Sequence, residues 1–549
     1  MSARELTRRS ARVSSASSDT LALVALYLGF DCSTQSMTAT VVEADAARPS
    51  AWRVVFESAL KFDEALPAFG TVHGVLPDDD RRVSQAPPAM WAAALDLMMA
   101  RVTRSGLDLQ SIAGISGGAQ QHGSVYLNAR AGARLASMDP ARSVDEQVTA
   151  MLSRPVSPLW MDASAGAEAA EIEQAVGGAH VLARHTGSRA VGRFTAAQIR
   201  RFWQQDPETY ERTANVHLVS SFLASLLAGT HAPLDPGDAS GTNLMDLARR
   251  DWWTPAVEAT APGLLVKLPS IVATSTVIGT LAPCWQTRHE FPAAPLIVWT
   301  GDNQASLAGS GLVSEGQIGI SLGTSDTIFG PMRDARVDSA GAGHVYCAPT
   351  GAFMALTCFA NGSLARERVR DTFGLDWAGF TALLRSTPPG NHGRMLLPWF
   401  EPEITPRVAT QGAVRHALEE SDAAGHVRAV VEGQMMAMMR HSAWMGVRPS
   451  EIHATGGASG NAAVLQVMAD VFGARVFRSV RANTTAPGAA LSAFRGVAAA
   501  AGVPIPWETI AAGGTRVEPI EPDMAAHAVY RDLMIEHARV EAAALAARA

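Results

Sequence analysis

The stretch GFDCSTQSMTAT (29–40) joins the end of an apolar run to a turn of small hydroxyl residues and then to a β-branched run. With its flanking residues it predicts three consecutive strands, over 25–31, 37–44 and 52–60. The stretch SLGTSDTIFG (321–330) has the same plan of strand, Ser/Thr turn and strand. The two copies lie roughly 290 residues apart, which indicates an internal duplication, and we place its boundary near residue 313.

Helices and strands alternate in both halves of the chain. A helix is predicted over 87–106, because apolar residues recur there near every 3.6 positions between prolines and a glycine. Strands are also predicted within 111–127, over 294–300, within 317–330 and over 344–349, 352–358, 451–455 and 474–479, and helices over 195–204, 213–228, 361–372, 423–446, 460–472, 487–500 and 525–548. This alternation predicts an α/β protein with three layers in each half.

Charge and composition exclude several functions. The chain has 45 basic and 52 acidic residues and a net charge of −7, so we expect no nucleic-acid partner. The longest apolar run near the N-terminus, 21–30, is about half of what a membrane-spanning helix needs, so no span is predicted. Residues 1–20 are rich in Arg and Ser; over 1–25 we expect a disordered tail or an over-called start codon rather than a targeting segment.

The positions of the cysteines and lysines exclude further classes of protein. The four cysteines, Cys32, Cys284, Cys347 and Cys358, are far apart and lack the spacing of a zinc site or a disulfide framework, which indicates reduced thiols and a cytoplasmic protein. Only two lysines are present, Lys61 and Lys267, and neither lies in a P-loop or in the strand motif of a protein kinase. No dinucleotide-binding glycine fingerprint is found either.

Two turns are candidates for anion binding. DCST (31–34) and GTSD (323–326) can direct backbone N–H groups and hydroxyls at a phosphate. One such turn alone is usually only a hairpin, whereas two at equivalent places of a duplicated chain favour a polyphosphate site. Asp31 can hold Mg²⁺ through water, because this ion prefers oxygen ligands and keeps several waters; its alternative role is to cap the turn.

Other motifs have both a functional and a structural interpretation. ATGGASGN (454–461) is either a nucleotide loop at a helix N-terminus or a tight connection, and GDN (301–303) is either an active-site corner or a helix cap. GAQQHGSVY (118–126) suits a polyhydroxylated substrate, although a lone histidine is often structural. For Asp162, Arg189 and Arg193, salt bridges are the default interpretation.

A serine hydrolase is the competing enzyme class. GISGG (114–118) and GISLG (319–323) match the G-x-S-x-G pattern around Ser116 and Ser321. That motif needs a strand, a sharp turn and a helix. In both places a second strand is predicted instead of a helix, which argues against a hydrolase.

The order of these motifs resembles the FGGY carbohydrate kinases. The similarity rests on GFDCSTQS, GAQQHGSVY, WMDAS, GSRAVGRFT, GDNQASLAG, GISLGTSDT and ATGGASGN, and it covers residues 26–500. Within the family the chain is most similar to members that phosphorylate D-xylulose, of the animal type. The resemblance implies a two-lobed actin/hexokinase-type (ribonuclease H-like) fold with duplicated mixed-sheet domains and an active-site cleft. Residues 26–313 would form the sugar-binding domain and residues 314–549 the nucleotide-binding domain.

The resemblance also implies the site and its ligands, D-xylulose, ATP and Mg²⁺. Asp302 is expected to be the general base on the 5-hydroxyl of the sugar, and the sugar-binding set is His122, Arg193, Asp302 and Asn303. The nucleotide and phosphate set is Asp31, Thr34, Gly323, Thr324, Trp377, Gly457, Ala458 and Asn461, with Asp31 facing the metal. We expect a monomer or a homodimer. Two alternatives stay open: a kinase for another ketose or a polyol (ribulose or glycerol), and a non-catalytic sugar sensor on the same fold.

Overall fold

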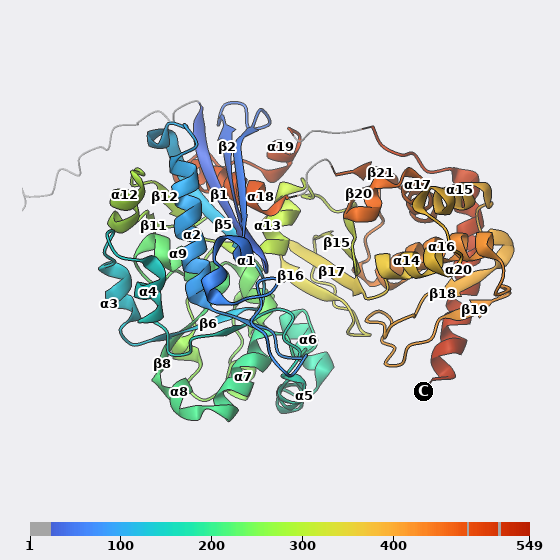
Figure 1. The fold of residues 1–549 in the computed structure, drawn as a ribbon, viewed down its shortest axis with the longest axis horizontal. Helices are drawn as coiled ribbons and strands as arrows, with labels where there is room; N and C mark the ends of the chain where they lie inside the picture. Colours follow the sequence, from blue (N-terminus) through green and yellow to red (C-terminus); the bar gives the residue numbers. More distant parts are fainter. Residues whose placement is uncertain (1–23, 480–482, 514–517, 549) are drawn as a thin grey trace, which may run out of the picture.

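Two α/β units lie side by side in the computed structural model, which describes residues 24–479, 483–513 and 518–548 (Figure 1). Residues 1–23, which make up most of the predicted tail over 1–25, lie outside the described residues. The first unit is built on a seven-stranded sheet and the second on a six-stranded sheet. The predicted α/β class with two duplicated mixed sheets is therefore confirmed.

The two sheets repeat one topology. In the first sheet, β2 (Ser36–Ala44) pairs antiparallel with both β1 (Ala25–Cys32) and β3 (Arg53–Lys61). On its other side β1 pairs parallel with β5 (Ile112–Ala119), and the next strands across the sheet are β12 (Pro295–Ile297) and β11 (Val277–Thr280). In the second, β14 (Gln317–Leu322) pairs antiparallel with β15 (Asp326–Met332), β15 with β17 (Phe353–Phe359), and β14 is parallel to β20 (Glu451–Thr455), followed by β21 (Arg475–Arg478). β16 (His344–Cys347) adds an edge strand to β17. Each sheet thus contains an antiparallel hairpin whose first strand, β1 or β14, is also paired with a parallel strand, β5 or β20.

Most predicted helices are confirmed. The structure has α2 (Pro88–Thr103), α7 (Thr195–Gln205), α14 (Ser363–Thr372), α16 (Ala423–His441), α17 (Ala462–Phe472), α18 (Thr485–Ala500) and α20 (Met524–Ala546). Helices for which no prediction was made include α5 (Gly166–Ala175), α6 (Ala179–Thr186), α8 (Pro207–Arg212), α11 (Thr254–Thr260), α12 (Pro283–His289), α15 (Trp377–Ser386) and α19 (Trp507–Ala511). Shorter helices are α1 (Phe62–Ala65), α3 (Ala131–Ala136), α4 (Val144–Thr149) and α10 (Pro236–Ala239). Small two-stranded sheets are formed by β4 (Gln85–Ala86) with β7 (Ser157–Pro158), by β9 (Met245–Asp246) with β10 (Asp251–Trp252), and by β18 (Met395–Leu397) with β19 (Val414–His416).

Two predicted elements differ in the structure. The helix predicted over 213–228 is wrong in its first part, because β8 (Thr213–Leu218) pairs antiparallel with β6 (Ser124–Asn128) and only α9 (Val219–Ala228) is helical. The strand predicted over 294–300 is split into β12 and β13 (Thr300–Gly301). Both strands pair with β5, and α13 (Asp302–Gly309) starts directly after β13.

The helix α18 lies on the first sheet, although it follows the second sheet in the sequence (Figure 1). Alternate residues of β1 face opposite sides, so Leu28 packs in the cluster with α2 and α9, whereas Tyr27 packs with Phe494 of α18. A Cβ atom on Gly29 would lie 2.1 Å from the carbonyl oxygen of Ala486, so the helix backbone touches the strand. The last part of the chain therefore covers one face of the N-terminal sheet.

α18 also fixes the position of α13. A Cβ atom on Gly488 would lie 1.9 Å from the carbonyl oxygen of Ala305, and the hydroxyls of Ser306 and Thr484 are 2.7 Å apart. Such a close approach of two helices is possible only without side chains at the contact. Since α13 begins with Asp302, this contact places one of the predicted site residues.

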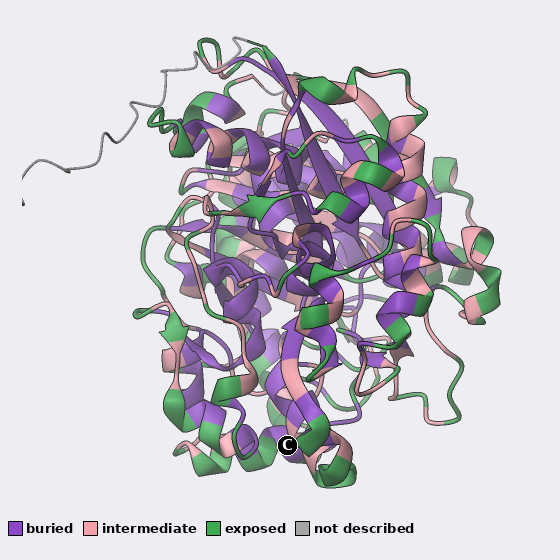
Figure 2. Ribbon diagram, turned by 90° about the vertical axis from the view of Figure 1, so that its left-hand side faces the viewer, coloured by how far each residue is buried: buried purple, intermediate pink, exposed green. Residues whose placement is uncertain are grey.

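The inner strands β1, β2 and β5 are largely buried, and exposed residues gather on outer helices and loops (Figure 2). Among the described residues, no helix is long and apolar enough to cross a membrane.

Candidate active site

Asp31 and Asp302 lie at the same edge of the first sheet. Asp31 is near the end of β1 and pairs in register with Gly118 of β5, while Thr300 of β13 pairs with the same Gly118 from the other side. Neighbouring strands are about 4.8 Å apart, so Asp31 and Thr300 flank one strand at a separation of about 10 Å. Asp302 follows Thr300 by two residues and starts α13. The two carboxylates, 271 positions apart in sequence, are thereby brought to one corner of the sheet.

Burial raises the pKa of both carboxyl groups. Burial, together with repulsion from Asp302, raises the pKa of Asp31 to about 7, while a 2.9 Å hydrogen bond donated by Asn483 opposes this shift. The pKa of Asp302 is raised to about 6, again by burial, and the backbone N–H of Asn303, 2.8 Å away, opposes that shift. Asp302 is thus ionised at neutral pH but holds a proton more strongly than an exposed aspartate, as a general base requires.

Asp31 has the properties of a ligand for a cation. Its Oδ1 atom is buried and has no hydrogen-bond partner in the described part of the chain. A buried carboxylate without a counter-charge is unfavourable, and a divalent ion would relieve this cost. Within the same residues no cluster of three or more His, Cys, Asp or Glu side chains gathers. The site therefore fits an ion that keeps several of its waters, as Mg²⁺ does.

The hydrogen bonds around His122 and Asn303 fix their orientation. Nδ1 of His122 lies 2.7 Å from the carbonyl oxygen of Gly241, which only accepts, so Nδ1 carries the proton and Nε2 is the acceptor. Burial and the charge of Arg193 lower the pKa of His122 to about 3, which keeps the ring neutral. The side-chain amide of Asn303 donates to Oε1 of Gln121 at 2.9 Å and to Oδ1 of Asp302 at 3.0 Å.

Buried amides next to these residues lack partners. Nε2 and Oε1 of Gln120 and Nε2 of Gln121 have no hydrogen bond to another group in the described residues. Unpaired buried polar atoms cost free energy, and a bound polyhydroxylated molecule would satisfy them. The stretch GAQQHGSVY therefore has the properties expected of a sugar site.

Arg193 belongs to the same group of residues as His122. Phe194 stacks on His122 with a centroid distance of 4.2 Å, and Nη2 of Arg193 lies 3.4 Å from Nε2 of His344 in β16. Arg193 and His344 line a cavity of about 680 Å³ whose walls come from both units, including Arg189 of the first and Glu403 of the second. This cavity lies between the two units, and Arg193 is the predicted sugar-binding residue that lines it.

The residues predicted for the adenosine side of the nucleotide lie in the second unit. Asn461 caps α17, with Oδ1 accepting from the N–H of Ala463 at 3.0 Å, and its amide donates to Thr381 of α15 at 2.8 Å. The same helix α15 begins with Trp377, whose ring is 44% exposed and lies under the guanidinium of Arg370 at 4.6 Å. Gly457 and Ala458 lie in the short 3-10 helix before Asn461, and a Cβ atom on Gly457 would point into open space.

Both Ser/Thr turns are contacted by residues from other parts of the chain. The turn with Gly323 and Thr324 packs on Gly362, and the carbonyl oxygen of Gly323 accepts from the N–H of Ser363 at 2.8 Å. Thr324 is exposed. In the equivalent turn of the first sheet the hydroxyl of Thr34 accepts a 2.8 Å hydrogen bond from Trp160.

Other residues of these motifs are structural. Asp162 is fully buried and accepts from the backbone of Ser84 and Ser164 and from Gln198. Arg189 pairs with Glu173 at 3.4 Å. The salt-bridge interpretation is thus confirmed for Arg189, whereas Asp162 is held by hydrogen bonds to neutral groups.

The serine residues of the hydrolase pattern lie within strands. Ser116 is inside β5, is 1% exposed, and donates to the carbonyl oxygen of Val298 at 3.2 Å. Ser321 is inside β14, which turns back into β15. Neither serine is at a strand-to-helix turn, so the hydrolase alternative is excluded.

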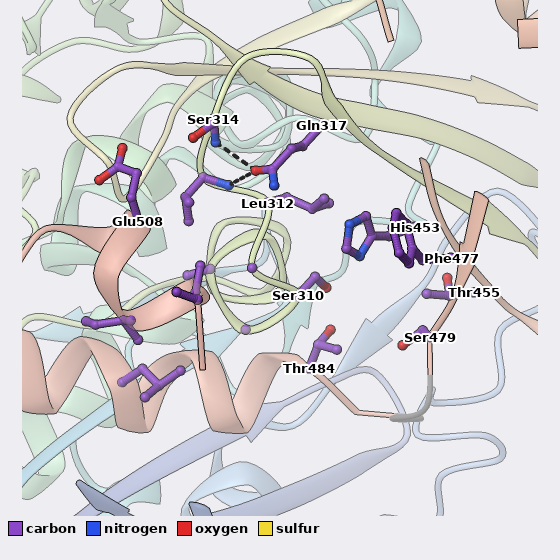
Figure 3. Close-up of a pocket in the computed structure, with 18 of the residues that line it drawn as sticks. Ser310, Leu312, Ser314, Gln317, His453, Thr455, Phe477, Ser479, Thr484 and Glu508 are labelled. Carbon is purple, nitrogen blue, oxygen red and sulfur yellow. Dashed lines mark hydrogen bonds between the residues drawn. The ribbon is translucent and has the colours of Figure 1, made fainter. Parts of the chain in front are cut away.

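A second cavity, of about 300 Å³, lies where the chain passes between the two units (Figure 3). It is lined by residues such as Ser310, Phe329, His453 and Thr484. Gln317, another lining residue, accepts hydrogen bonds from the N–H groups of Val313 and Ser314 at 3.0 and 2.9 Å. α13 ends at this cavity, and its eight residues place Asp302 about 12 Å away at the other end. The cavity is therefore separate from the carboxylate corner.

Comparison with known proteins agrees with this geometry. Residues 26–309 match the family model described as the N-terminal domain of the FGGY family of carbohydrate kinases, and residues 318–497 match its C-terminal domain. The chain belongs to the FGGY family of carbohydrate kinases. It is similar to a xylulose kinase of Rattus norvegicus, with 39% identity over 94% of this chain and 96% of the relative.

Solved structures of FGGY kinases show the same fold. A xylulose kinase from Rhodospirillum rubrum superposes with a TM-score of 0.78 at 20% identity, over 94% of this chain and 98% of that one. A gluconate kinase from Lactobacillus acidophilus gives a TM-score of 0.79 at 17% identity, over 96% and 99%. The predicted actin/hexokinase-type fold is confirmed, and because the fold is equally similar to kinases of different names, the substrate must be argued from the site.

Residues that sequence reasoning missed and that contact the predicted site include Asn483 on Asp31, Trp160 on Thr34 and His344 on Arg193. Trp160 stands in the motif WMDAS, where Asp162 drew attention instead. Asn483 and His344 lie in no motif, and their contacts join residues 452 and 151 positions apart. Only the folded chain identifies them.

Proposed function

We propose that this FGGY kinase transfers the γ-phosphoryl group of ATP to the 5-hydroxyl of D-xylulose. The observation that carries the proposal is the corner where Asp302 and Asn303 lie beside His122 and Arg193, in a chain similar over most of its length to a protein named xylulose kinase. The unpaired amides of Gln120 and Gln121 and the neutral imidazole of His122 offer hydrogen bonds to hydroxyl groups, which suits a polyhydroxylated sugar.

Asp302 acts as the general base in this proposal. The 5-oxygen of the sugar forms a bond to the γ-phosphorus while the bond from that phosphorus to the β,γ-bridging oxygen breaks, so ADP leaves and the hydroxyl proton moves to Asp302. A base with a pKa of about 6 is ionised at neutral pH and accepts this proton. Asn303 holds the carboxylate, and Nε2 of His122 accepts from a sugar hydroxyl.

The adenosine of ATP is assigned to the second unit, the phosphates to the two Ser/Thr turns, and the metal to the corner of the first sheet at Asp31. Trp377, Gly457, Ala458 and Asn461 support an adenosine site, and Thr34, Gly323 and Thr324 supply hydroxyls and backbone groups for the phosphates. Asp31 would hold Mg²⁺ through water, and the ion would neutralise charge on the transferred phosphate.

The domain division is also part of the proposal. We assign sugar binding to residues 26–313 and nucleotide binding to residues 314–549, with α18 returning to the first sheet. A cytoplasmic location and a monomer or homodimer remain our expectation.

A substrate panel tests the function. ADP release by the purified protein is measured with Mg·ATP and D-xylulose, L-xylulose, D-ribulose, L-ribulose or glycerol, with Asp302→Asn as control. Selective turnover of D-xylulose that depends on Asp302 is expected. Selective turnover of another sugar contradicts the substrate while leaving the base in place, and no turnover of any sugar would favour a sensor.

A further inference from the structure

His344 lies at the sugar corner but belongs to the second unit. It is the first residue of β16, the edge strand of the second sheet, and only 4% of its surface is exposed. β16 is bonded to the first unit, because the N–H of Val345 donates to the carbonyl oxygen of Gly187 at 2.9 Å and the N–H of Cys347 donates to Oγ of Ser240 at 3.0 Å. The strand therefore carries the imidazole across the boundary between the units.

The partners of His344 determine where its ring proton is. Nε2 lies 3.4 Å from Nη2 of Arg193, and Nδ1 lies 3.1 Å from Oγ of Ser188. A guanidinium group has donors only, so Nε2 is the unprotonated acceptor and Nδ1–H donates to Ser188. Burial, with the charge of Arg193, lowers the pKa of His344 well below its ordinary value, so the ring remains neutral at physiological pH.

Because its partner is a neutral acceptor, Arg193 keeps its positive charge and most of its N–H donors available for a ligand. No carboxylate lies within ion-pair distance of Arg193 in the parts of the chain that the structure describes. A carboxylate would occupy two of the five N–H donors and offset the charge, whereas an imidazole nitrogen takes one donor. Phe194 contacts both imidazoles, with centroid distances of 4.2 Å to His122 and 5.3 Å to His344, so these side chains form one packed group.

We propose that His344 is a positioning residue for sugar binding, which holds the Arg193 guanidinium so that its remaining N–H groups meet the oxygen atoms of the ketose. This inference rests on the proposed role of Arg193 in the sugar site. A residue from the nucleotide-binding unit thus completes the sugar pocket. Affinity for the sugar therefore depends on how closely the second unit is seated against the first.

Direct binding of the sugar without nucleotide, by calorimetry, tests the inference, together with the KM and kcat of each variant. His344→Ala removes the acceptor, and we expect sugar affinity to fall about 10-fold, the loss of one hydrogen bond to a charged group, while kcat and the KM for ATP change less than about 3-fold. His344→Gln places a carbonyl oxygen near the position of Nε2 and should restore most of the affinity. The sugar used is the one that the substrate panel selects, so a wrong choice of D-xylulose leaves this test intact.

His217 offers a matched control. It is also buried and also bonded through both nitrogens, at 3.0 Å to Ser221 and 3.0 Å to His231, but it contacts none of the sugar residues. His217→Ala should lower the melting temperature without weakening sugar binding. If it weakens binding as much as His344→Ala does, the effect is general loss of structure and the inference is overturned.

Two further variants separate the possible failures. Wild-type sugar affinity in His344→Ala overturns the inference, provided that Arg193→Met binds the sugar weakly. Wild-type affinity in Arg193→Met contradicts the role of Arg193 in the proposed function itself. If His344→Ala does not fold, Ser188→Ala is used instead, because it keeps the imidazole but removes the hydroxyl that binds Nδ1. Sugar binding about 3-fold weaker than that of the wild type supports the inference, and unchanged binding overturns it.

Discussion

The indole N–H of Trp160 donates a hydrogen bond of 2.8 Å to the hydroxyl of Thr34, in the turn that follows β1. Because the hydroxyl accepts this bond, its own proton is free to be donated to a phosphate oxygen. Trp160 is 42% exposed, so its ring is held at the surface of the site and not by the core. The pair links the motif WMDAS to the first Ser/Thr turn.

Trp160→Phe keeps the aromatic ring and removes the donor. We expect the KM for ATP to rise about 5-fold, equivalent to about 1 kcal/mol for one hydrogen bond, with the KM for the sugar unchanged. Steady-state kinetics with ATP varied at saturating sugar measure this change. Thr34→Val, which removes the hydroxyl itself, should have a larger effect on the same constant; an effect confined to the sugar KM would contradict the assignment of Thr34 to the phosphates.

Asp302→Asn should lower kcat by about 10²–10⁴-fold, because the amide cannot accept the hydroxyl proton. Sugar binding should persist, since the amide oxygen can still accept the backbone bond from Asn303. Calorimetric titration with the sugar and an ADP-release assay give the two quantities. A variant that turns over like the wild type would remove Asp302 from the role of base.

The pH dependence follows from the same carboxylate. The pKa of Asp302 is raised to about 6 by burial, and only the ionised form accepts a proton, so kcat/KM should be constant above that pH and fall about tenfold per unit below it. The acidic limb should be absent from the residual activity of Asp302→Asn. A profile that is flat down to pH 4.5 would contradict the predicted role.

Asp31→Asn should separate metal binding from stability. In the metal-free protein the pKa of Asp31 is about 7 in the folded state and near 3.8 in the unfolded state. As the pH rises through this range, Asp31 ionises more readily in the unfolded chain, so the free energy of unfolding falls. At pH 8 the variant should therefore melt at a higher temperature than the metal-free wild type, while needing more Mg²⁺ for activity. Melting curves with EDTA and with Mg²⁺ check this; a melting temperature below that of the wild type in EDTA would contradict it.

Gly488→Ala should disturb α13 through its contact with α18. The added Cβ atom would lie 1.9 Å from the carbonyl oxygen of Ala305, so the helices must separate, at a cost of about 1–3 kcal/mol. Because α13 begins with Asp302, kcat should fall as well. Gly166→Ala, at the start of α5 where no atom lies within 4 Å of the new carbon, should change the stability by less than about 0.5 kcal/mol. Equal effects of the two variants would argue against the contact.

The local pattern of the sequence was sufficient for most elements of the sheets. The hairpin of β1 and β2 and the hairpin of β14 and β15 have β-branched runs around small-residue turns, so their pairing partner is the next segment in sequence. Residues 213–218 were assigned to a helix because their partner β6 lies about 90 positions earlier and leaves no local sign. The position of α18 on the first sheet has the same cause, since nothing within the helix specifies which sheet it covers.

The site was predictable as a set of motifs but not as a set of contacts. Asp31 and Asp302 could be identified as site residues, yet the effect of Asp302 on the pKa of Asp31 depends on how strands β1, β5 and β13 align. His344 appeared only as part of an expected strand. Its importance comes from Arg193 and Ser188, which approach it through the contact between β16 and the first unit.

The placement of α18 also constrains how the protein is made. Residues 485–500 supply the helix that covers Tyr27 and Gly29 on the first sheet, and a ribosome releases them only after nearly the whole chain has been synthesised. The sheet that forms first thus keeps an apolar face open to solvent and to chaperones throughout most of translation. A fragment that stops near residue 313 would keep that face exposed for its entire lifetime, so soluble expression of the N-terminal half alone should fail unless α18 is supplied as a separate peptide.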